Sequence, residues 1–286
     1  MAQQELDHLS GQTTTGHEWD GLKELNTPLP KWWLYVFYAC IIWSFGYFLF
    51  YPSWPMVSDY TKGLWGATMR SDSIAAYETG IKDRLARAKI PADASVDQIK
   101  GNKDFLEFAM ANGKAAFGDN CAPCHGSGAT GAPGYPSLQD DDWLWGGKLA
   151  DVYQTIRYGI RSGHSQARDS QMPNFGKDGV LKKEEMTAVA DYVVSLSDTS
   201  VKGTDAGKKL FSDNCAACHG EDAKGNLELG APNLADKIWL YGGGSAKVIA
   251  QMNVASHGVM PAWEDRLDPI TVKSLAVYVH SLGGGK

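Results

Sequence analysis

The sequence predicts an all-α fold, in which one N-terminal transmembrane helix is followed by two tandem copies of a small helical domain. Residues 32–51 form an apolar run without a formal charge. Two segments that resemble each other follow, at 104–198 and 203–286, and each ends in an apolar stripe at helical spacing. The stripes are Met186, Val189, Val193 and Leu196 in the first segment, and Val272, Leu275, Val279 and Leu282 in the second.

The run at 32–51 is long enough to cross a bilayer, since about 20 apolar residues span the hydrocarbon layer as a helix. Aromatic residues at both ends are typical of the membrane interfaces, and they are Trp32, Trp33, Tyr35, Tyr47, Tyr51 and Trp54. A cleaved signal peptide would have a shorter core and a basic start, whereas the polar segment 1–31 comes first. We therefore expect an uncleaved single-pass anchor rather than a buried core helix. Cys40, inside the run, is expected to be a small buried hydrophobe.

Residues 52–103 connect the anchor to the repeats. Ile74, Ile81 and Leu85 recur at roughly helical spacing, and Pro91 follows them. We expect a helical linker with no chemistry of its own.

Four of the five cysteines lie in two copies of a Cys-x-x-Cys-His pattern, at 121–125 and 215–219. Two thiols at this spacing can both add to the vinyl groups of one haem, and the histidine after them can reach the iron as an axial ligand. Covalent haem attachment takes place outside the cytoplasm, so the pattern also predicts a location. We expect two haem c groups, attached at Cys121 and Cys124 with His125 on the iron, and at Cys215 and Cys218 with His219 on the iron.

Other roles for these cysteines fit the sequence less well. Pairs that share one structural zinc usually lie about 15–20 residues apart, whereas residues 125–214 separate these two pairs. A thioredoxin-like redox pair would follow a strand, but helical, charged sequence precedes both pairs. A chain of this length also needs no disulfide framework to build a core.

The second haem ligand is predicted from a methionine that precedes proline in each repeat, Met172 and Met260. Methionine–histidine ligation raises the haem potential, and two filled axial positions leave no open site for oxygen or peroxide. Core methionines are the alternative. Each methionine could close the haem of its own repeat, which is the simpler arrangement, or the two could be exchanged, and the sequence leaves the pairing open.

Several other residues could compete for the same roles. His164 and His257 precede the two methionines but do not match each other, so we expect solvated loop histidines. Met186 follows a helix stripe and is expected in the core, while Met110 and Met252 lack matching partners in the other repeat. Arg157 and Arg161 are candidates for neutralising haem propionates, although an exposed helix face explains them about equally well.

The repeats resemble the class I cytochrome c fold, in which the first and last helices cross and the chain wraps the haem. Matching residues run through both copies: Gly113, Phe117, Asn120, Gly134, Pro136, Trp143 and Tyr192 correspond to Gly207, Phe211, Asn214, Gly230, Pro232, Trp239 and Tyr278. The resemblance implies that the carbonyls of Pro136 and Pro232 accept a hydrogen bond from the proximal histidines, which would fix the imidazole tautomer.

The whole chain is similar to the diheme subunit III of cbb3-type cytochrome c oxidases. The likeness rests on the lead Asp20-Gly21-Leu22 through Pro28-Leu29-Pro30-Lys31-Trp32-Trp33, one anchor, two haem repeats, and Ser170-Gln171-Met172-Pro173. It implies a bacterial inner-membrane protein with a cytoplasmic N-terminus and periplasmic haem domains. Electrons would pass from a donor cytochrome c to the haem-copper catalytic subunit, beside a monoheme cytochrome subunit, in a proton-translocating respiratory oxidase. Nucleic acid is not an expected partner.

The resemblance also implies that this chain has no active site of its own. The chain has a net charge of −6, and the part beyond residue 51 has 25 positive and 28 negative groups, or −3. This mild acidity, with the haem propionates, suits docking with a basic donor cytochrome, but it also describes many ordinary domains. Two alternatives stay open: a diheme subunit of another membrane redox enzyme, such as a dehydrogenase, and a diheme peroxidase, which would need one haem with a displaceable ligand.

Overall fold

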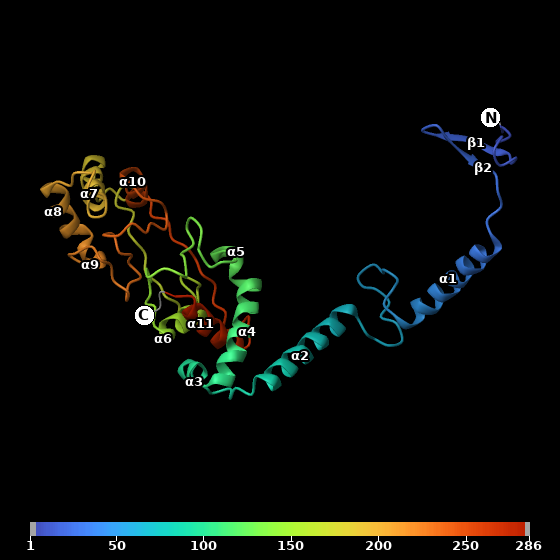
Figure 1. Cartoon of the computed structure of the whole chain (residues 1–286), viewed down its shortest axis with the longest axis horizontal. Helices are drawn as coiled ribbons and strands as arrows, with labels where there is room; N and C mark the ends of the chain where they lie inside the picture. The colour runs from blue at the N-terminus through green and yellow to red at the C-terminus, as the bar shows by residue number, and fades with distance from the viewer. Residues whose placement is uncertain (1–3, 284–286) are drawn as a thin grey trace. The chain divides into compact units, whose positions relative to one another are not determined.

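The computed structural model describes residues 4–283 and is mostly helical, as the sequence predicts (Figure 1). The ends of the predicted segments 1–31 and 203–286 therefore lie outside the described residues. Two compact units make up the chain, residues 1–83 and residues 84–286. The elements are β1 (Thr14–Trp19), β2 (Leu22–Leu25), α1 (Lys31–Phe50), α2 (Met69–Ala88), α3 (Val96–Gly101), α4 (Lys103–Asn120), α5 (Ala122–His125), α6 (Leu149–Tyr158), α7 (Lys183–Ser195), α8 (Asp205–Asn214), α9 (Ala216–His219), α10 (Ser245–Asn253) and α11 (Pro269–Ser281).

A short antiparallel hairpin, β1 and β2, lies in the polar N-terminal segment, and the all-α prediction did not include it. Its turn is Asp20-Gly21, and both residues have positive φ, 50° and 87°. Two-residue turns of this kind suit the right-handed twist of the flanking strands. Trp19 pairs with Leu22 across the turn, and Lys23 forms an ion pair with Glu5.

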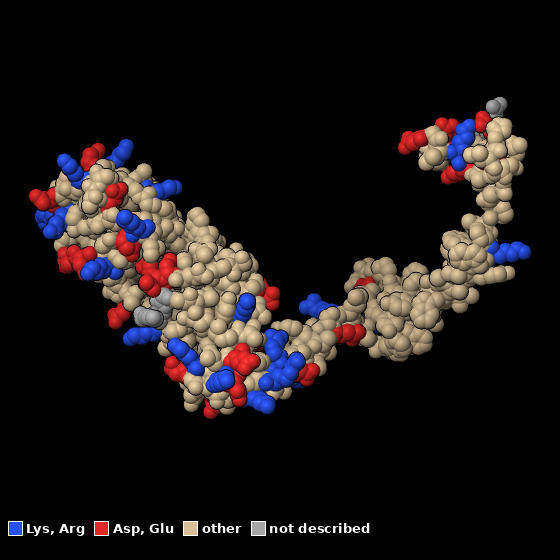
Figure 2. All heavy atoms as spheres, viewed as in Figure 1, with Lys and Arg blue, Asp and Glu red and all other residues tan. Residues whose placement is uncertain are grey.

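The predicted anchor is a single helix, α1, whose bounds agree with 32–51 to within one residue. None of its residues is buried. With 20 residues and a mean hydropathy of 1.6, it is long and apolar enough to cross a membrane. Figure 2 shows hardly any charged side chains along it, and the sequence has none between Lys31 and Asp59. The buried-core alternative is thus excluded. Cys40 is exposed, so the expectation that it is buried was wrong.

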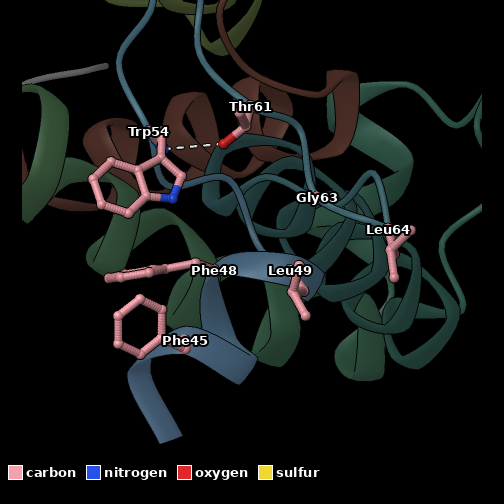
Figure 3. Close-up of a pocket in the computed structure, with 7 residues that line it drawn as sticks. All are labelled: Phe45, Phe48, Leu49, Trp54, Thr61, Gly63 and Leu64. Atoms are coloured by element: carbon pink, nitrogen blue, oxygen red, sulfur yellow. Dashed lines mark hydrogen bonds between the residues drawn. The ribbon is translucent and has the colours of Figure 1, made fainter. Parts of the chain in front are cut away.

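The C-terminal end of α1 is closed by the segment that follows it. The last carbonyls of a helix lack partners within the helix; here the amide of Leu64 donates to the carbonyl of Leu49 at 2.9 Å, and that of Trp65 to Phe50 at 3.3 Å. Gly63 permits this close approach, since a Cβ there would lie 2.3 Å from the Phe50 oxygen. A small apolar hollow remains beside the turn, lined by Phe45, Phe48, Leu49, Trp54, Thr61, Gly63 and Leu64 (Figure 3).

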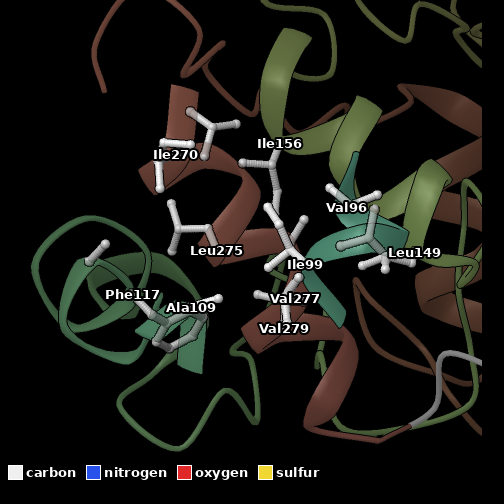
Figure 4. Close-up of a cluster of buried hydrophobic side chains, with 14 of the residues drawn as sticks. Val96, Ile99, Ala109, Phe117, Leu149, Ile156, Ile270, Leu275, Val277 and Val279 are labelled. Carbon is white, nitrogen blue, oxygen red and sulfur yellow. The ribbon is translucent and has the colours of Figure 1, made fainter. Parts of the chain in front are cut away.

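The predicted linker is helical, as expected, but it also contributes to the core of the second unit. Helix α2 is mostly exposed. Helix α3 begins at Ser95 with a capping box, in which the Ser95 side chain and Gln98 satisfy each other's backbone amides. Val96 and Ile99 on α3 are buried against α4, α6 and α11 (Figure 4).

The second unit consists of two lobes around separate apolar clusters. Lobe A contains α3, α4, α5, α6 and α11, and lobe B contains α7, α8, α9 and α10; the two groups are separate in Figure 1. In lobe A, helix α4 packs along α11, and α6 packs on α11 as well. In lobe B, α8 packs on α7, and α10 also packs on α7. Met186, Met252 and Met110 pack in or against these clusters, as core residues.

The closing helices are exchanged between the two repeats. Helix α11 comes from the second repeat but closes the lobe that contains the first Cys-x-x-Cys-His motif, and α7 closes the other lobe. The resemblance to class I cytochromes c implied that the first and last helices of one repeat cross, whereas α4 and α8 each pack on the last helix of the other repeat. The boundaries 104–198 and 203–286 mark repeats in the sequence, whereas each lobe combines parts of both. Only residues 196–204 join α7 to α8, so pairing these neighbours closes a short loop, which loses less chain entropy than a long one.

Each lobe has the same helix crossing. A Cβ on Gly113 of α4 would lie 2.4 Å from the Ser274 oxygen of α11, and one on Gly207 of α8 would lie 2.2 Å from the Ala188 oxygen of α7. Beside these glycines, Phe117 packs on Tyr278 and Phe211 on Tyr192, with ring centroids 5.6 and 5.5 Å apart. The repeated glycine and aromatic pair therefore specify two equivalent close crossings.

The lobes meet through equivalent loops. The Gly134 amide donates to the Leu240 carbonyl at 2.8 Å, joining the first repeat's loop to the second repeat. In the opposite direction, Trp145 packs so tightly on Gly230 that a Cβ there would lie 2.2 Å from an indole carbon. These reciprocal contacts make the two lobes one compact unit.

Candidate functional site

Each Cys-x-x-Cys-His motif lies on a short helix directly after a long one, α5 after α4 and α9 after α8. The Nδ1 atom of His125 lies 2.9 Å from the Pro136 carbonyl oxygen, and that of His219 lies 3.0 Å from Pro232. A carbonyl only accepts, so Nδ1 carries the proton and the lone pair is on Nε2. This is the tautomer in which Nε2 can bind a metal.

The loop after each histidine holds the proline carbonyl in place. The amide of Gly131 donates to the His125 carbonyl, and that of Gly225 to the His219 carbonyl, both at 2.8 Å. Both glycines have positive φ, and a Cβ on either would lie 2.5 Å from a backbone oxygen. These glycines therefore let the chain turn back so that the proline reaches the imidazole.

Burial favours neutral side chains at both motifs. It lowers the pKa of His125 and of His219, and the hydrogen bond to the proline carbonyl opposes this only in part. Burial and the neighbouring cysteine raise the pKa of the Cys121 thiol to about 11, and that of Cys215 likewise to about 11. Thiols of such high pKa are poor redox nucleophiles, which agrees with the sequence argument against a thioredoxin-like pair.

Each methionine packs against the apolar cluster of the lobe that contains the other repeat's motif. Met260 packs against the apolar cluster of lobe A, together with Cys121 and Trp143. Met172 packs against the cluster of lobe B, which contains Cys215. The crossing point is a backbone bridge, in which Ile160 and Met260 exchange two hydrogen bonds of 3.0 Å.

Two polar groups beside these sites suit a haem carboxylate. The indole Nε1 of Trp143 is buried with no hydrogen-bond partner in the described chain, and an unpaired buried donor costs about 1–3 kcal/mol. The Nε of Arg168 is also buried and unpaired. Its Nη2 lies 3.5 Å from Asp151 Oδ1, an ion-pair contact without hydrogen-bond geometry. Propionates are acceptors that could satisfy such donors, so the residues present fit a haem.

The competing residues have other partners. His164 stacks on Tyr158 and lies 3.5 Å from Glu264, while His257 accepts a hydrogen bond from the Met172 amide at 3.0 Å. Both histidines lie in loops, as expected, and their rings are partly buried rather than fully solvated. Burial and the positive charge of Arg161 lower the pKa of His257, which keeps Nε2 an acceptor.

The two arginines that were candidates for propionates also bind protein groups. Arg157 pairs with Glu264 and lies over the Tyr158 ring. Arg161 donates to two backbone carbonyls, those of Gly258 and Ser170. Sequence reasoning missed Arg168, whose position depends on a backbone bridge to Gly159 and Ile160 that no motif marks.

Comparison with known proteins shows the family. The family described as cytochrome C oxidase, cbb3-type, subunit III, matches residues 108–193 and 202–279. The chain belongs to this family. The N-terminal domain of cytochrome oxidase-cbb3, FixP, also matches, over residues 11–58, which covers the hairpin and α1. The predicted resemblance and the two cytochrome c domains are therefore confirmed.

Full-length relatives agree with this assignment. The chain is 55% identical to the cbb3-type cytochrome c oxidase subunit FixP of Bradyrhizobium diazoefficiens, over 99% of this chain and 98% of that protein. It is 50% identical to the subunit CcoP of Azospirillum brasilense, over the whole of both chains. As a member of the subunit III family, the chain is a cytochrome c that functions in electron transport.

Proposed function

We propose that this chain is the diheme relay of a cbb3-type oxidase, which takes electrons from a periplasmic donor cytochrome c and passes them to the haem-copper subunit. The observation that carries the proposal is the matched pair of sites in one compact unit. Each site combines a Cys-x-x-Cys-His motif, a histidine oriented by a proline carbonyl, and a methionine supplied by the other repeat.

The exchanged packing supports one set of ligands for each haem. Cys121 and Cys124 would hold one haem c, with His125 and Met260 on its iron. Cys215 and Cys218 would hold the other, with His219 and Met172. Bound haem supplies an iron that cycles between two oxidation states one electron at a time.

The protein's contribution is to fix the ligands and to exclude other chemistry. The Pro136 and Pro232 carbonyls orient the histidines, and the apolar clusters hold the methionines against the sites. With both axial positions filled by side chains, neither iron would be open to oxygen or peroxide. Oxygen reduction and proton translocation would therefore take place in the partner subunit, and this chain would have no active site of its own.

The N-terminal helix supports a membrane-bound location for the relay. Helix α1 would span the bacterial inner membrane once, with the hairpin segment in the cytoplasm and both lobes in the periplasm, where haem is attached. The names of the relatives support assembly with other subunits of a cbb3-type oxidase. In our proposal these partners include a monoheme cytochrome subunit and the haem-copper subunit.

Purification from gently solubilised membranes tests the proposal. We expect the tagged chain to carry two low-spin haems and to purify with a haem-copper subunit that oxidises a reduced donor cytochrome. Purification with a dehydrogenase subunit instead would assign it to another membrane enzyme. A large high-spin haem fraction in both redox states at low temperature would favour a peroxidase and contradict the relay.

A further inference from the structure

The point where the two methionine loops cross contains one side chain that binds both of them. Arg161 follows α6, and its Nε donates to the Gly258 carbonyl while its Nη1 donates to the Ser170 carbonyl, each at 2.7 Å. Gly258 lies two residues before Met260, and Ser170 lies two residues before Met172. The guanidinium therefore binds equivalent carbonyls in the two loops.

The backbone around Arg161 holds it beside both loops. Arg161 itself has a φ of 50°, a left-handed conformation that is uncommon for residues other than glycine and costs free energy. Its amide donates to the Arg168 carbonyl at 2.8 Å, and the preceding residue, Ile160, bridges to Met260. A Cβ on Gly159 would lie 2.3 Å from the Met260 oxygen, so the segment lies tightly against the second loop.

A second side chain, in the Met260 loop, binds the amide of Met172 itself. His257 Nε2 accepts the hydrogen bond of the Met172 amide at 3.0 Å, although the two residues belong to different repeats. No corresponding side-chain contact to the Met260 amide exists in the described residues, where the Ile160 carbonyl takes that place. Arg161 thus contacts both loops through side-chain hydrogen bonds, and His257 contacts the Met172 loop.

We propose that Arg161 is a positioning residue shared by both distal sites, which couples the two methionine loops, and that His257 positions Met172 alone. The inference rests on the proposed iron ligation by the two methionines. Two charge-assisted hydrogen bonds to neutral carbonyls hold each loop at a fixed distance from the other. A change at this one residue therefore loosens the methionine at both haems.

Displacement of methionine by added imidazole tests the inference in the full-length haem-loaded chain in detergent. In the oxidised state, imidazole replaces methionine on the iron, and the weak long-wavelength methionine–iron absorption band disappears. Loss of one charge-assisted hydrogen bond is worth roughly tenfold or more in an equilibrium constant. We expect Arg161→Ala to lower the apparent Kd for imidazole about tenfold at both haems, and His257→Ala to do so at one.

Three further variants separate the possible causes. Arg161→Lys keeps the charge but replaces two fixed nitrogens by one, so we expect a smaller change in imidazole affinity, again at both haems. If Arg161→Ala alters both affinities while Arg161→Lys keeps the wild-type affinities, charge rather than loop geometry matters. That result would overturn the inference. Arg157→Ala removes the same charge from the adjacent helix end, where the partner is Glu264, and should leave both affinities unchanged. His257→Gln retains an acceptor and should restore much of the wild-type affinity.

The outcomes distinguish this inference from the ligation on which it rests. If Met172→Ala and Met260→Ala leave the absorption band and the imidazole affinity intact, the proposed ligation is wrong. The methionines are ligands if each of these variants removes the absorption band of one haem. If Arg161→Ala then changes the imidazole affinity of only one haem, or of none, the shared role of Arg161 is wrong. Should Arg161→Ala lose its haem or its helical circular dichroism, Arg161→Lys and His257→Ala decide by the same criteria.

Discussion

The proximal and distal halves of each site are built in different ways. The proximal half is local: His125 and its partner Pro136 lie in one short stretch, and His219 and Pro232 repeat the arrangement almost unchanged. The distal half is assembled from both repeats, because each methionine and the closing helix after it pack in the lobe of the other motif. A duplicated sequence can thus preserve local geometry in both copies while its long-range packing is exchanged.

Loss of a proximal histidine should have the largest effect, and it should stay within one site. We expect His125→Ala and His219→Ala each to remove one axial ligand and to leave one haem high-spin with a changed potential. Electron transfer from donor to oxidase should fall to a small fraction of the unsubstituted rate. Oxidase turnover with the donor cytochrome measures this, and full turnover in either variant would contradict a relay in which both haems act in series.

Methionine replacement in single-haem chains tests the exchange directly. With Cys215→Ala and Cys218→Ala, only the first motif can hold haem. In that chain Met260→Ala should lower the haem potential markedly, since methionine ligation raises it, whereas Met172→Ala should leave it nearly unchanged. Redox titration measures both. The reverse result would mean that each repeat closes its own haem.

Substitutions at the two helix crossings should have effects of intermediate size, on the stability of each lobe. Ala at Gly113 or Gly207 places a Cβ 2.4 or 2.2 Å from a backbone oxygen, so we expect each substitution to destabilise its lobe by about 1–3 kcal/mol. Gly118 is the matched control, on the same helix as Gly113 but with nothing within 4 Å of a Cβ. Gly118→Ala should be neutral or stabilise by up to about 1 kcal/mol. Thermal unfolding followed by circular dichroism distinguishes these outcomes, and equal effects at Gly113 and Gly118 would count against a close crossing.

The smallest expected effect is pH-dependent and lies where the two repeats meet. Burial, followed by the charges of Asp236 and Asp140, raises the pKa of Asp142 to about 6 from 3.8. Folding therefore favours the protonated form, and this stabilisation is present at low pH and is lost as pH rises through about 6. Asp142 is only half-buried, so we expect Asp142→Asn to stabilise by about 1 kcal/mol at pH 8. The gain should shrink near pH 4, and the exposed neighbour Asp141→Asn should show no such trend in thermal unfolding.

The local parts of this molecule could be predicted from sequence, and the non-local parts could not. The motifs, their prolines and the anchor each lie within a short stretch of sequence. Residue spacing within such a stretch is enough to predict the structure and the haem attachment. The methionines were found because they recur in parallel, yet their pairing depends on which closing helix packs where. Both repeats have the same glycine and aromatic residues at the crossing, so α4 could accept either closing helix as far as composition shows.

Other features were missed for different reasons. Arg161 binds backbone carbonyls, which leave no trace in side-chain patterns, and His257 meets Met172 only because the loops cross. The N-terminal hairpin, in contrast, had a signal in the sequence, because Asp20-Gly21 is a common two-residue hairpin turn.

The exchanged closing helices have a consequence for the order of synthesis. The first motif is translated well before the second, but lobe A needs α11, which ends at Ser281. Among the described residues, the apolar cluster of lobe B contains none beyond α10, which ends at Asn253. The lobe whose haem-attachment motif is translated first is therefore the last to close, and a chain truncated before α11 can complete only the later-encoded motif.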